Sequence, residues 1–410
     1  MNKLYTQTAR FCQFFSTVLP SRTAFLASLF MLIGLNAAQA QLTGTKNIPG
    51  DYTTISAAVT DLNTQGVGAG GVVFNIAAGH TETISATISL TATGTSADPI
   101  TFQKSGSGAN PKITSYTGGT GTPGSATQDG IWRLVGSDYV TIDGIDLMEN
   151  AANTANPATM EYGYALYKSS GTNGCQNVTI KNCTITLNRV NNATGSGPAV
   201  DGSRGIDMVN ATPTAATTAL TVTAASGSNS NNKFFSNTIQ NCNIGIAMIG
   251  YAAASPFTLA DTGNDVGGSS AATGNTIKNY GGGGTSSPAA GVRTLAQYGL
   301  NISYNTINNN DGGGLNHATT LRGIYVNTAT SANATISFNT LSIKSGATTS
   351  QLSVIENVSG STAAGNTISI NNNTIINCSY TAQTTGIIYG IYNNAATPAN
   401  LNINNNANNN

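Results

Sequence analysis

The densest cluster of potentially catalytic residues in the sequence consists of three basic residues close to one acid, in the middle of the chain. Lys168, Lys181 and Arg189 follow Glu161 at short intervals. A Lys or Arg can act as a base, while a second cation or Ca²⁺ neutralises a neighbouring carboxylate. This set would suit elimination on an acidic sugar. The alternative interpretation is solvated surface charge.

Carboxylates form two further candidates, both for calcium. Asp143, Asp146 and Glu149 lie within seven residues of sequence, and Asp261 and Asp265 lie in a Gly-rich segment. Paired carboxylates can hold Ca²⁺ or divide acid and base roles. Against the first group, Asp143-Gly144 has the sequence of a turn. No other cofactor is indicated.

Several common sites are excluded by their missing context. The glycines of GTGTPG, at Gly119, Gly121 and Gly124, are followed by no helix pattern, which argues against a nucleotide site. The two histidines, His80 and His317, are far apart in the sequence. The chain contains no C-x-x-C pair and no basic run, so neither zinc nor nucleic acid is an expected partner.

The first forty residues have the features of an export signal. A basic leader precedes the uncharged run Ala24–Leu35, and Ala38-Gln39-Ala40 supplies a cleavage pattern. The run is too short to span a membrane. We therefore expect a signal peptide at 1–40, a mature chain without a membrane span, and an extracellular or cell-surface location. Loss of Lys3, Arg10 and Arg22 would change the net charge from +0 to −3.

A short phrase that contains Asn-Thr-Ile or a close variant recurs along the chain. Its apolar marker falls at Ile180, Ile239, Ile277, Ile307, Leu341 and Ile375, at steps of 59, 38, 30, 34 and 34 residues. A second unit, Gly followed by an apolar strand, recurs at Gly163, Gly205, Gly245, Gly291 and Gly323. Repeats of this length are typical of solenoids. The segments Ala211–Asn232 and Ala252–Ala272 are interpreted as insertions into single coils.

The repeat length predicts which secondary-structure elements each coil contains. Strands of four to six residues cannot bury a face alone, whereas equivalent strands of successive coils can stack in parallel about 4.8 Å apart. Asn suits left-handed turns and amide stacking from rung to rung. Cys183, Cys242 and Cys378 follow the second Asn of the phrase, which predicts one interior row, as buried thiols or as a disulfide between rungs. Asp51–Asn63 has the apolar spacing of a short helix that would cap the first coil.

Two segments near the N-terminus resemble the right-handed parallel β-helix proteins of the pectin-lyase-like group. PGDYTTISAAVTDLN and GGVVFNIAAGHTETISATIS are similar to the opening of pectin methylesterases and of lyases related to chondroitinase and alginate lyase. Glu82 matches the acid of that opening, and His80 stands where an aromatic residue usually falls. DPITFQKSG and DYVTIDGIDL resemble early rungs. The resemblance implies an all-β fold, a right-handed parallel β-helix with a short N-terminal capping helix, in an exported bacterial surface protein.

The catalytic motifs of those enzymes are missing, since QDG at Gln128–Gly130 is only a fragment of one. We therefore expect a non-catalytic secreted or cell-surface scaffold, adhesin-like, that contacts polysaccharides or cell-surface glycans. The alternative is a lyase or esterase acting on acidic glycans. The chain stops in an Asn-rich rung, LNINNNANNN, without a sequence signal for a cap or a turn. We thus expect the β-helix domain, 41–410, to be truncated at its C-terminus.

Overall fold

The computed structural model describes residues 40–119, 121–282, 288–312, 317–330, 332–382 and 385–409. The predicted signal peptide, apart from Ala40, lies outside these residues and stays a prediction. From Gln41 to Asn410 the chain forms one compact unit. None of the described helices is long and apolar enough to cross a membrane.

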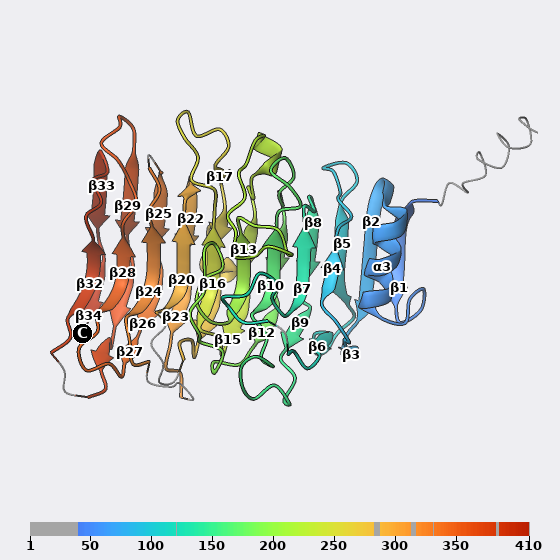
Figure 1. The fold of residues 1–410 in the computed structure, drawn as a ribbon, viewed down its shortest axis with the longest axis horizontal. Helices are drawn as coiled ribbons and strands as arrows, with labels where there is room; N and C mark the ends of the chain where they lie inside the picture. The colour runs from blue at the N-terminus through green and yellow to red at the C-terminus, as the bar shows by residue number, and fades with distance from the viewer. Residues whose placement is uncertain are drawn as a thin grey trace, which may run out of the picture. The chain divides into compact units, whose positions relative to one another are not determined.

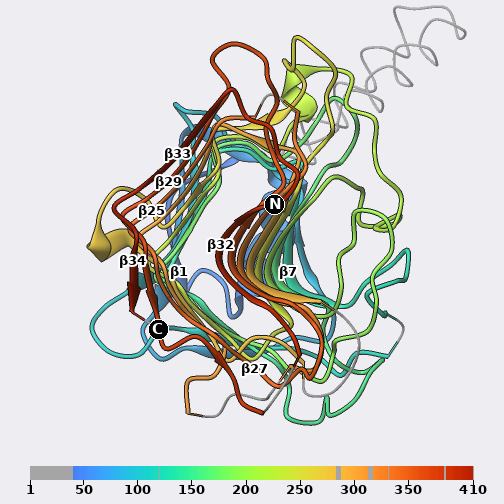
Figure 2. The ribbon, with the colours of Figure 1, turned by 90° about the vertical axis from the view of Figure 1, so that its left-hand side faces the viewer.

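Three long parallel sheets wind around a common interior, and each rung adds one strand to each of them (Figures 1 and 2). Sheet A contains β1 (Leu42–Ile48), β2 (Val67–Ala77), β5 (Ile100–Ser105), β8 (Val140–Asp143), β11 (Thr179–Lys181), β14 (Lys233–Phe235), β18 (Asp265–Val266), β22 (Leu300–Ser303), β25 (Ala334–Ser337), β29 (Thr367–Asn371) and β33 (Asn400–Asn404). Every pairing between the described strands is parallel, and the predicted right-handed parallel β-helix is confirmed.

The other two sheets follow in each rung. Sheet B contains β3 (Thr81–Thr83), β6 (Lys112–Thr114), β9 (Asp146–Met148), β12 (Thr184–Thr186), β15 (Thr238–Gln240), β19 (Thr276–Lys278), β23 (Thr306–Asn308), β26 (Thr340–Ser342), β30 (Thr374–Ile376) and β34 (Ala407–Asn409). Sheet C contains β4 (Ile88–Leu90), β7 (Gly130–Val135), β10 (Tyr162–Tyr167), β13 (Arg204–Val209), β16 (Ile244–Ile249), β20 (Ala289–Leu295), β24 (Leu321–Asn327), β28 (Leu352–Asn357) and β32 (Ile388–Asn393). LNINNNANNN thus supplies β33 and β34, with a turn at Asn405 that the sequence interpretation missed.

Short elements decorate the coil. Two small sheets pair β17 (Asp261–Thr262) with β21 (Gln297–Tyr298) and β27 (Lys344–Ser345) with β31 (Ser379–Tyr380), and the 3₁₀ turns are η1 (Ala225–Gly227) and η2 (Ala271–Thr273). The first insertion runs from β13 to β14, as expected. The second contains β17 and also β18, which belongs to sheet A, so it is only partly an insertion.

The helix α3 (Ile55–Gln65) covers the N-terminal end of the interior, as predicted for a cap (Figure 1). It begins four residues later than expected because Thr54 is its N-cap and accepts a hydrogen bond from the Ala57 amide at 3.1 Å. Glu82 also accepts from the Ile55 and Ser56 amides, at 2.8 and 3.1 Å. The acid of the family-like opening therefore holds the start of the cap.

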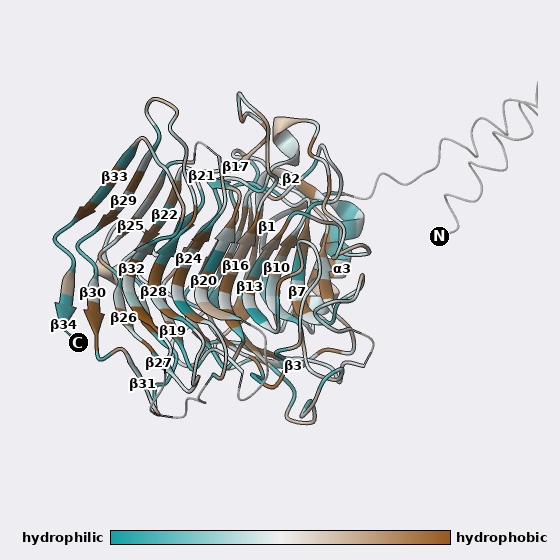
Figure 3. Ribbon diagram, turned by 60° about the vertical axis from the view of Figure 1, so that its left-hand side comes forward, coloured by the Kyte–Doolittle hydropathy of each residue, from teal (hydrophilic) through white to brown (hydrophobic). Residues whose placement is uncertain are grey.

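Apolar residues recur at equivalent places from rung to rung and fill the interior (Figure 3). The Ile row of sheet B faces the Gly row of sheet C, since a Cβ on Gly205 would lie 2.2 Å from Ile239 Cγ2 and one on Gly245 would lie 2.4 Å from Ile277 Cγ2. The sequence pattern had suggested that these glycines precede the strands, but they lie inside them. The two sequence repeats occur together because the glycines of sheet C leave space for the Ile side chains of sheet B.

The two asparagines of the repeat have different roles. The first forms a ladder of Asn237, Asn275, Asn305, Asn339, Asn373 and Asn406, buried except at the partly exposed Asn406, in which each side-chain amide donates to the next Oδ1 at 2.9–3.1 Å. The second adopts a positive φ at Asn241, Asn279 and Asn377. Amide stacking and left-handed turns are both confirmed, but they belong to different positions.

Two assignments of register were wrong. Ile180 lies in sheet A opposite Ile142 and Phe234, and the residue that aligns with Ile239 is Ile185. Cys183 consequently occupies the ladder position, where its amide donates to Asn237 Oδ1 at 3.1 Å, whereas Cys242 and Cys378 follow their strands by two residues. The cysteines do not form one row. They are all buried and form no disulfide among the described residues.

Another segment alternates without forming one strand. Thr83–Leu90 alternates like a single strand, but the chain turns between β3 and β4. The alternation arises because both of its ends contribute inward residues to different sheets.

Candidate functional site

The four residues of the predicted elimination site are not brought together. Lys168 is fully buried and pairs with Asp261, with Nζ 3.0 Å from Oδ1. Lys181 is part-exposed and pairs with Asp143 at 3.1 Å. Arg189 donates to the Asn279 carbonyl at 3.3 Å. Lys168 follows a sheet C strand and Lys181 ends a sheet A strand, so their closeness in sequence is lost in the coil.

Glu161 is a buried structural acid in this fold. Its Oε2 accepts from the Asp129 amide at 2.7 Å, and its Oε1 accepts from Asn191 Nδ2 at 2.9 Å. Burial raises the pKa of Glu161 to about 7. Arg204 and Asp207 form a fully buried pair nearby, with Nη2 and Oδ2 2.8 Å apart. Together these contacts hold loops of the middle rungs over sheet C.

The carboxylates considered for calcium are each occupied by protein donors. Asp146 Oδ1 accepts from Asn110 Nδ2 and the Thr184 amide, at 2.8 and 2.7 Å. Asp265 Oδ1 accepts from the Gly268 amide and Asn301 Nδ2, at 3.0 and 2.7 Å. The turn interpretation of Asp143-Gly144 holds, because Gly144 has a φ of 69°.

Within the described ranges no three His, Cys, Asp or Glu side chains are grouped to hold a metal. The acids present do not fit a calcium site, since Asp261 is taken by Lys168 and Asp143 by Lys181. No chemical step is therefore assigned to Ca²⁺.

The outer face of sheet C carries a different group of side chains, on its C-terminal rungs. We call it the tyrosine–arginine face: Arg293, Arg322, Tyr325, Glu356, Tyr389 and Tyr392. Strand register sets Arg293, Tyr325, Glu356 and Tyr392 side by side on β20, β24, β28 and β32. Tyr389 lies one strand beyond Ser353, which pairs with Arg322. The face therefore spans four successive rungs.

Loops cover part of the outer face of sheet C and leave the rest exposed to solvent. Over β10, β13 and β16 the outward side chains are buried beneath apolar loop residues such as Ala199, Val200, Ala211 and Ala216. Figure 2 shows these green loops outside sheet C. On the later rungs Tyr325, Tyr389 and Tyr392 are all partly exposed.

Arg322 is the centre of the face. Its Nε donates to Glu356 Oε2 at 2.6 Å, and its guanidinium carbon lies 4.0 Å from the centroid of the Tyr325 ring. Asn394 Nδ2 also donates to Glu356, at 3.0 Å. Arg322 and Tyr325 share a face although they are three residues apart, because Gly323 and Ile324 between them both face the interior. Burial raises the pKa of the Tyr325 hydroxyl.

Two further contacts complete the surface. Arg293 Nη1 lies 3.1 Å from Asp201 Oδ2, which belongs to the loop at the edge of the face. The rings of Tyr389 and Tyr392 are stacked, with centroids 4.2 Å apart and planes 11° apart. The face thus combines planar aromatic surfaces with cations that are held in place by acids.

Sequence reasoning missed this face. The strands GVRTL and GIYV were read only for their apolar residues, yet Arg293 and Tyr325 occur at matching positions within them. That match was the available signal. Glu356 and Tyr392 lie in strands that no repeat phrase had marked, so their register was not readable.

Comparisons with known proteins show the same architecture. No protein-family model matches the sequence, and neither does any curated protein. Among solved structures, the alginate lyase from Paenibacillus sp. str. FPU-7 is 14% identical, with 89% of this chain and 99% of that chain covered at a TM-score of 0.46. Pectate lyase Pel9A is 14% identical, with 88% and 80% covered and a TM-score of 0.44.

A surface protein is similar as well. The Streptococcus pneumoniae surface protein and adhesin PfbA is 13% identical, with 92% of this chain and 97% of that chain covered at a TM-score of 0.41. The likeness to these three proteins concerns the fold alone. The three stacked sheets of the chain itself make it a right-handed parallel β-helix protein, and its activity has to be argued from its own residues.

Proposed function

We propose that this protein is a non-catalytic extracellular or cell-surface scaffold that binds glycans on its tyrosine–arginine face. The observation that carries the proposal is the arrangement of Arg322, held by Glu356 and lying over Tyr325, beside the stacked pair Tyr389 and Tyr392. The extracellular location rests on the predicted signal peptide.

The chemistry of the face suits sugars. An aromatic ring offers an apolar plane on which the C–H face of a pyranose can stack, and Arg offers several N–H donors to hydroxyl groups. Nε of Arg322 is used by Glu356, which fixes the guanidinium and lowers the entropic cost of binding. The face spans four successive rungs, so several sugar units of one chain can bind at once.

The charges favour a neutral or weakly charged glycan. Arg293 and Arg322 each have an acid within 3.1 Å, so neither is an uncompensated cation for a polyuronate. Catalysis would also need a base near neutral pH. Glu356 accepts from both Arg322 and Asn394, and Tyr325 has a raised pKa, so neither is suited to that role.

A polysaccharide lyase or esterase is the second candidate. One observation favours it: two arginines, two acids and a tyrosine converge on one face, which is the kind of constellation that such an enzyme requires. The two candidates differ in a simple way, because only the enzyme releases a product.

Binding to immobilised glycans tests the proposal. Purified protein is measured against neutral polysaccharides such as xylan, mannan and cellulose, and against pectin, alginate and chondroitin sulfate. We expect binding to a neutral glycan, weakened at least about tenfold, or about 1.4 kcal/mol, by Tyr325→Ala. Tyr304→Ala is the matched control, since Tyr304 precedes β23 at the corner between sheets A and B and should leave binding unchanged.

The same samples are assayed for unsaturated products and released methanol. Product formed by the wild type but not by Tyr325→Ala would refute the scaffold proposal and support the lyase or esterase. Equal binding by wild type and Tyr325→Ala, with both proteins folded, would remove the face from the proposal.

A further inference from the structure

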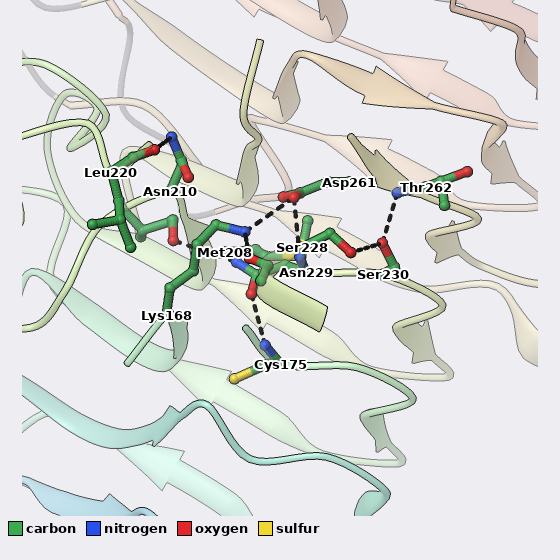
Figure 4. A network of polar contacts seen from close by, with 12 residues as sticks. Lys168, Cys175, Met208, Asn210, Leu220, Ser228, Asn229, Ser230, Asp261 and Thr262 are labelled. Atoms are coloured by element: carbon green, nitrogen blue, oxygen red, sulfur yellow. Dashed lines mark hydrogen bonds and ion pairs between the residues drawn. The ribbon is translucent and has the colours of Figure 1, made fainter. Parts of the chain in front are cut away.

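Two residues that sequence reasoning placed in separate sites meet in the protein. Lys168 follows β10, and Asp261 begins β17 in the second insertion, 93 residues later. Figure 4 shows them pointing toward each other beside Ser228, Asn229 and Ser230. Both side chains are fully buried, so neither can contact a polymeric ligand.

The contacts of the pair are few and specific. Lys168 Nζ lies 3.0 Å from Asp261 Oδ1 and donates to the Gly227 carbonyl at 2.8 Å. Asp261 Oδ1 also accepts from the Asn229 amide at 3.0 Å. Asp261 Oδ2 makes no hydrogen bond of normal geometry with a described residue, although the Gln297 side chain is near enough to lower the carboxyl pKa.

We propose that Lys168 and Asp261 become joined by an intramolecular isopeptide bond. The ammonium first passes a proton to the carboxylate within the pair. The amine nitrogen then attacks Cγ of Asp261, a C–N bond forms, and the bond from Cγ to Oδ2 breaks. Oδ2 leaves as water with two of the three ammonium protons, and the third stays on the amide nitrogen. No oxidant, reductant or other reactant is required.

The surroundings fit the product better than the starting pair. The amide oxygen, the former Oδ1, keeps the Asn229 N–H as its donor, and the amide N–H keeps the Gly227 carbonyl as its acceptor. The oxygen that leaves is the one without a hydrogen bond of normal geometry. A buried ion pair is costly to desolvate, whereas a neutral amide with both partners in place is not.

The starting geometry also favours the reaction. Two groups held in contact react as one unit, which removes much of the entropic barrier. The Asn229 N–H points at the oxygen on which negative charge develops during the attack. Burial raises the pKa of Asp261, which favours the neutral acid that can lose water.

The bond would fasten an insertion to the coil. It closes a loop between two residues that are 93 positions apart in the sequence, and a covalent loop of this kind lowers the entropy of the unfolded chain. It therefore adds a covalent restraint to the non-covalent contacts that hold the rungs together.

Peptide mass spectrometry on the purified full chain tests the proposal. The protein is reduced, alkylated, denatured and digested with trypsin. Trypsin does not cleave after an acylated lysine, so we expect peptide 134–181 joined to peptide 234–278, with a mass one water below the sum of the two. Fragment ions should place the branch at Lys168 and Asp261.

Two controls use the same chemistry. Lys168→Arg retains a cation but cannot form this amide, so it should give separate peptides. The part-exposed pair Lys181 and Asp143, 3.1 Å apart in the same protein, should remain unlinked. Wild-type protein that yields mainly peptide 134–168 and an unmodified peptide 234–278 would overturn the proposal, and this result does not depend on whether any variant folds.

Discussion

Replacing Glu149 by Gln should make the protein more stable, and the gain should grow with pH. Glu149 follows β9 and is buried, with Oε1 accepting from the Met160 amide at 2.6 Å. Its Oε2 makes no hydrogen bond of normal geometry with a described residue. Burial, with a smaller contribution from the charge of Glu161, raises the pKa of Glu149 from 4.5 to about 8, although the Met160 amide and the nearby Asn153 and Asn188 oppose the shift. Gln keeps a side-chain oxygen that accepts the hydrogen bond from the Met160 amide, and it has no carboxyl group to titrate.

The sign follows from proton binding. Below about pH 4.5 the residue is protonated in both the folded and the unfolded chain, so it has no effect. As pH rises toward 8, the unfolded chain loses the proton while the folded chain retains it, so the folded state is progressively destabilised. The full effect, above both pKa values, is roughly 5 kcal/mol. Between pH 5 and pH 8 the advantage of Glu149→Gln over wild type should grow by about 3 kcal/mol.

Urea unfolding at pH 5, 6, 7 and 8 measures this difference. Trp132, the single tryptophan of the chain, is buried in β7 and reports on the same part of the coil by its fluorescence. Glu161 titrates in both proteins and therefore largely cancels from the comparison. A difference between variant and wild type that stays constant from pH 5 to pH 8 would show that Glu149 is not a strained buried acid.

Three substitutions test how the coil is held together, each by the shift of the thermal or urea midpoint. Asn305→Ala removes the Oδ1 that accepts from the Asn275 amide and side chain, at 3.1 and 2.9 Å, and should cost about 3–5 kcal/mol, against less than about 1 for Asn308→Ala at the surface. Ile277→Asp should prevent folding or cost more than about 4 kcal/mol by placing an unpaired charge in the dry row, whereas Thr276→Asp beside it should be mild. Gly205→Ala should cost about 1–3 kcal/mol, because the added Cβ would lie 2.2 Å from Ile239 Cγ2 and 2.7 Å from the Gly245 carbonyl oxygen, and combined with Ile239→Ala it should cost less than the sum of the two single changes if the contact with Ile239 contributes. Midpoints for Asn305→Ala, Ile277→Asp and Gly205→Ala that match wild type would contradict the rung packing described above.

The sequence carried the architecture because the interior rows repeat. Ile239, Ile277, Ile307, Leu341 and Ile375 follow one another at nearly constant steps and do stack in sheet B. The placement of Ile180 in this row was wrong because strands of sheets A and B have similar sequences. NVTIKN places Ile180 in sheet A, and NCTITL places Ile185 in sheet B. Local sequence did not distinguish them, since only pairing with the next rung decides the register.

The candidate site was harder to predict for a related reason. Lys168, Lys181 and Glu161 are close in sequence, but each rung sends consecutive strands to different sheets, which separates them. Arg293, Tyr325, Glu356 and Tyr392 are far apart in sequence and become neighbours only when four coils are in register. Whether such residues are exposed depends on the insertions that cover β10 to β16, and loop paths were not readable from the repeat.

Hydroxyl-radical footprinting with the best-binding polysaccharide tests the central claim most directly, because it oxidises exposed aromatic side chains and reads them individually. Tyr325, Tyr389 and Tyr392 are partly exposed on the proposed face, while Phe338, 47% exposed, lies at the corner before β26 and stacks on Tyr304. We expect bound glycan to lower oxidation at the first three residues severalfold and to leave Tyr304 and Phe338 unchanged. Protection of Tyr304 and Phe338 without protection of Tyr325, Tyr389 and Tyr392 would contradict the central claim.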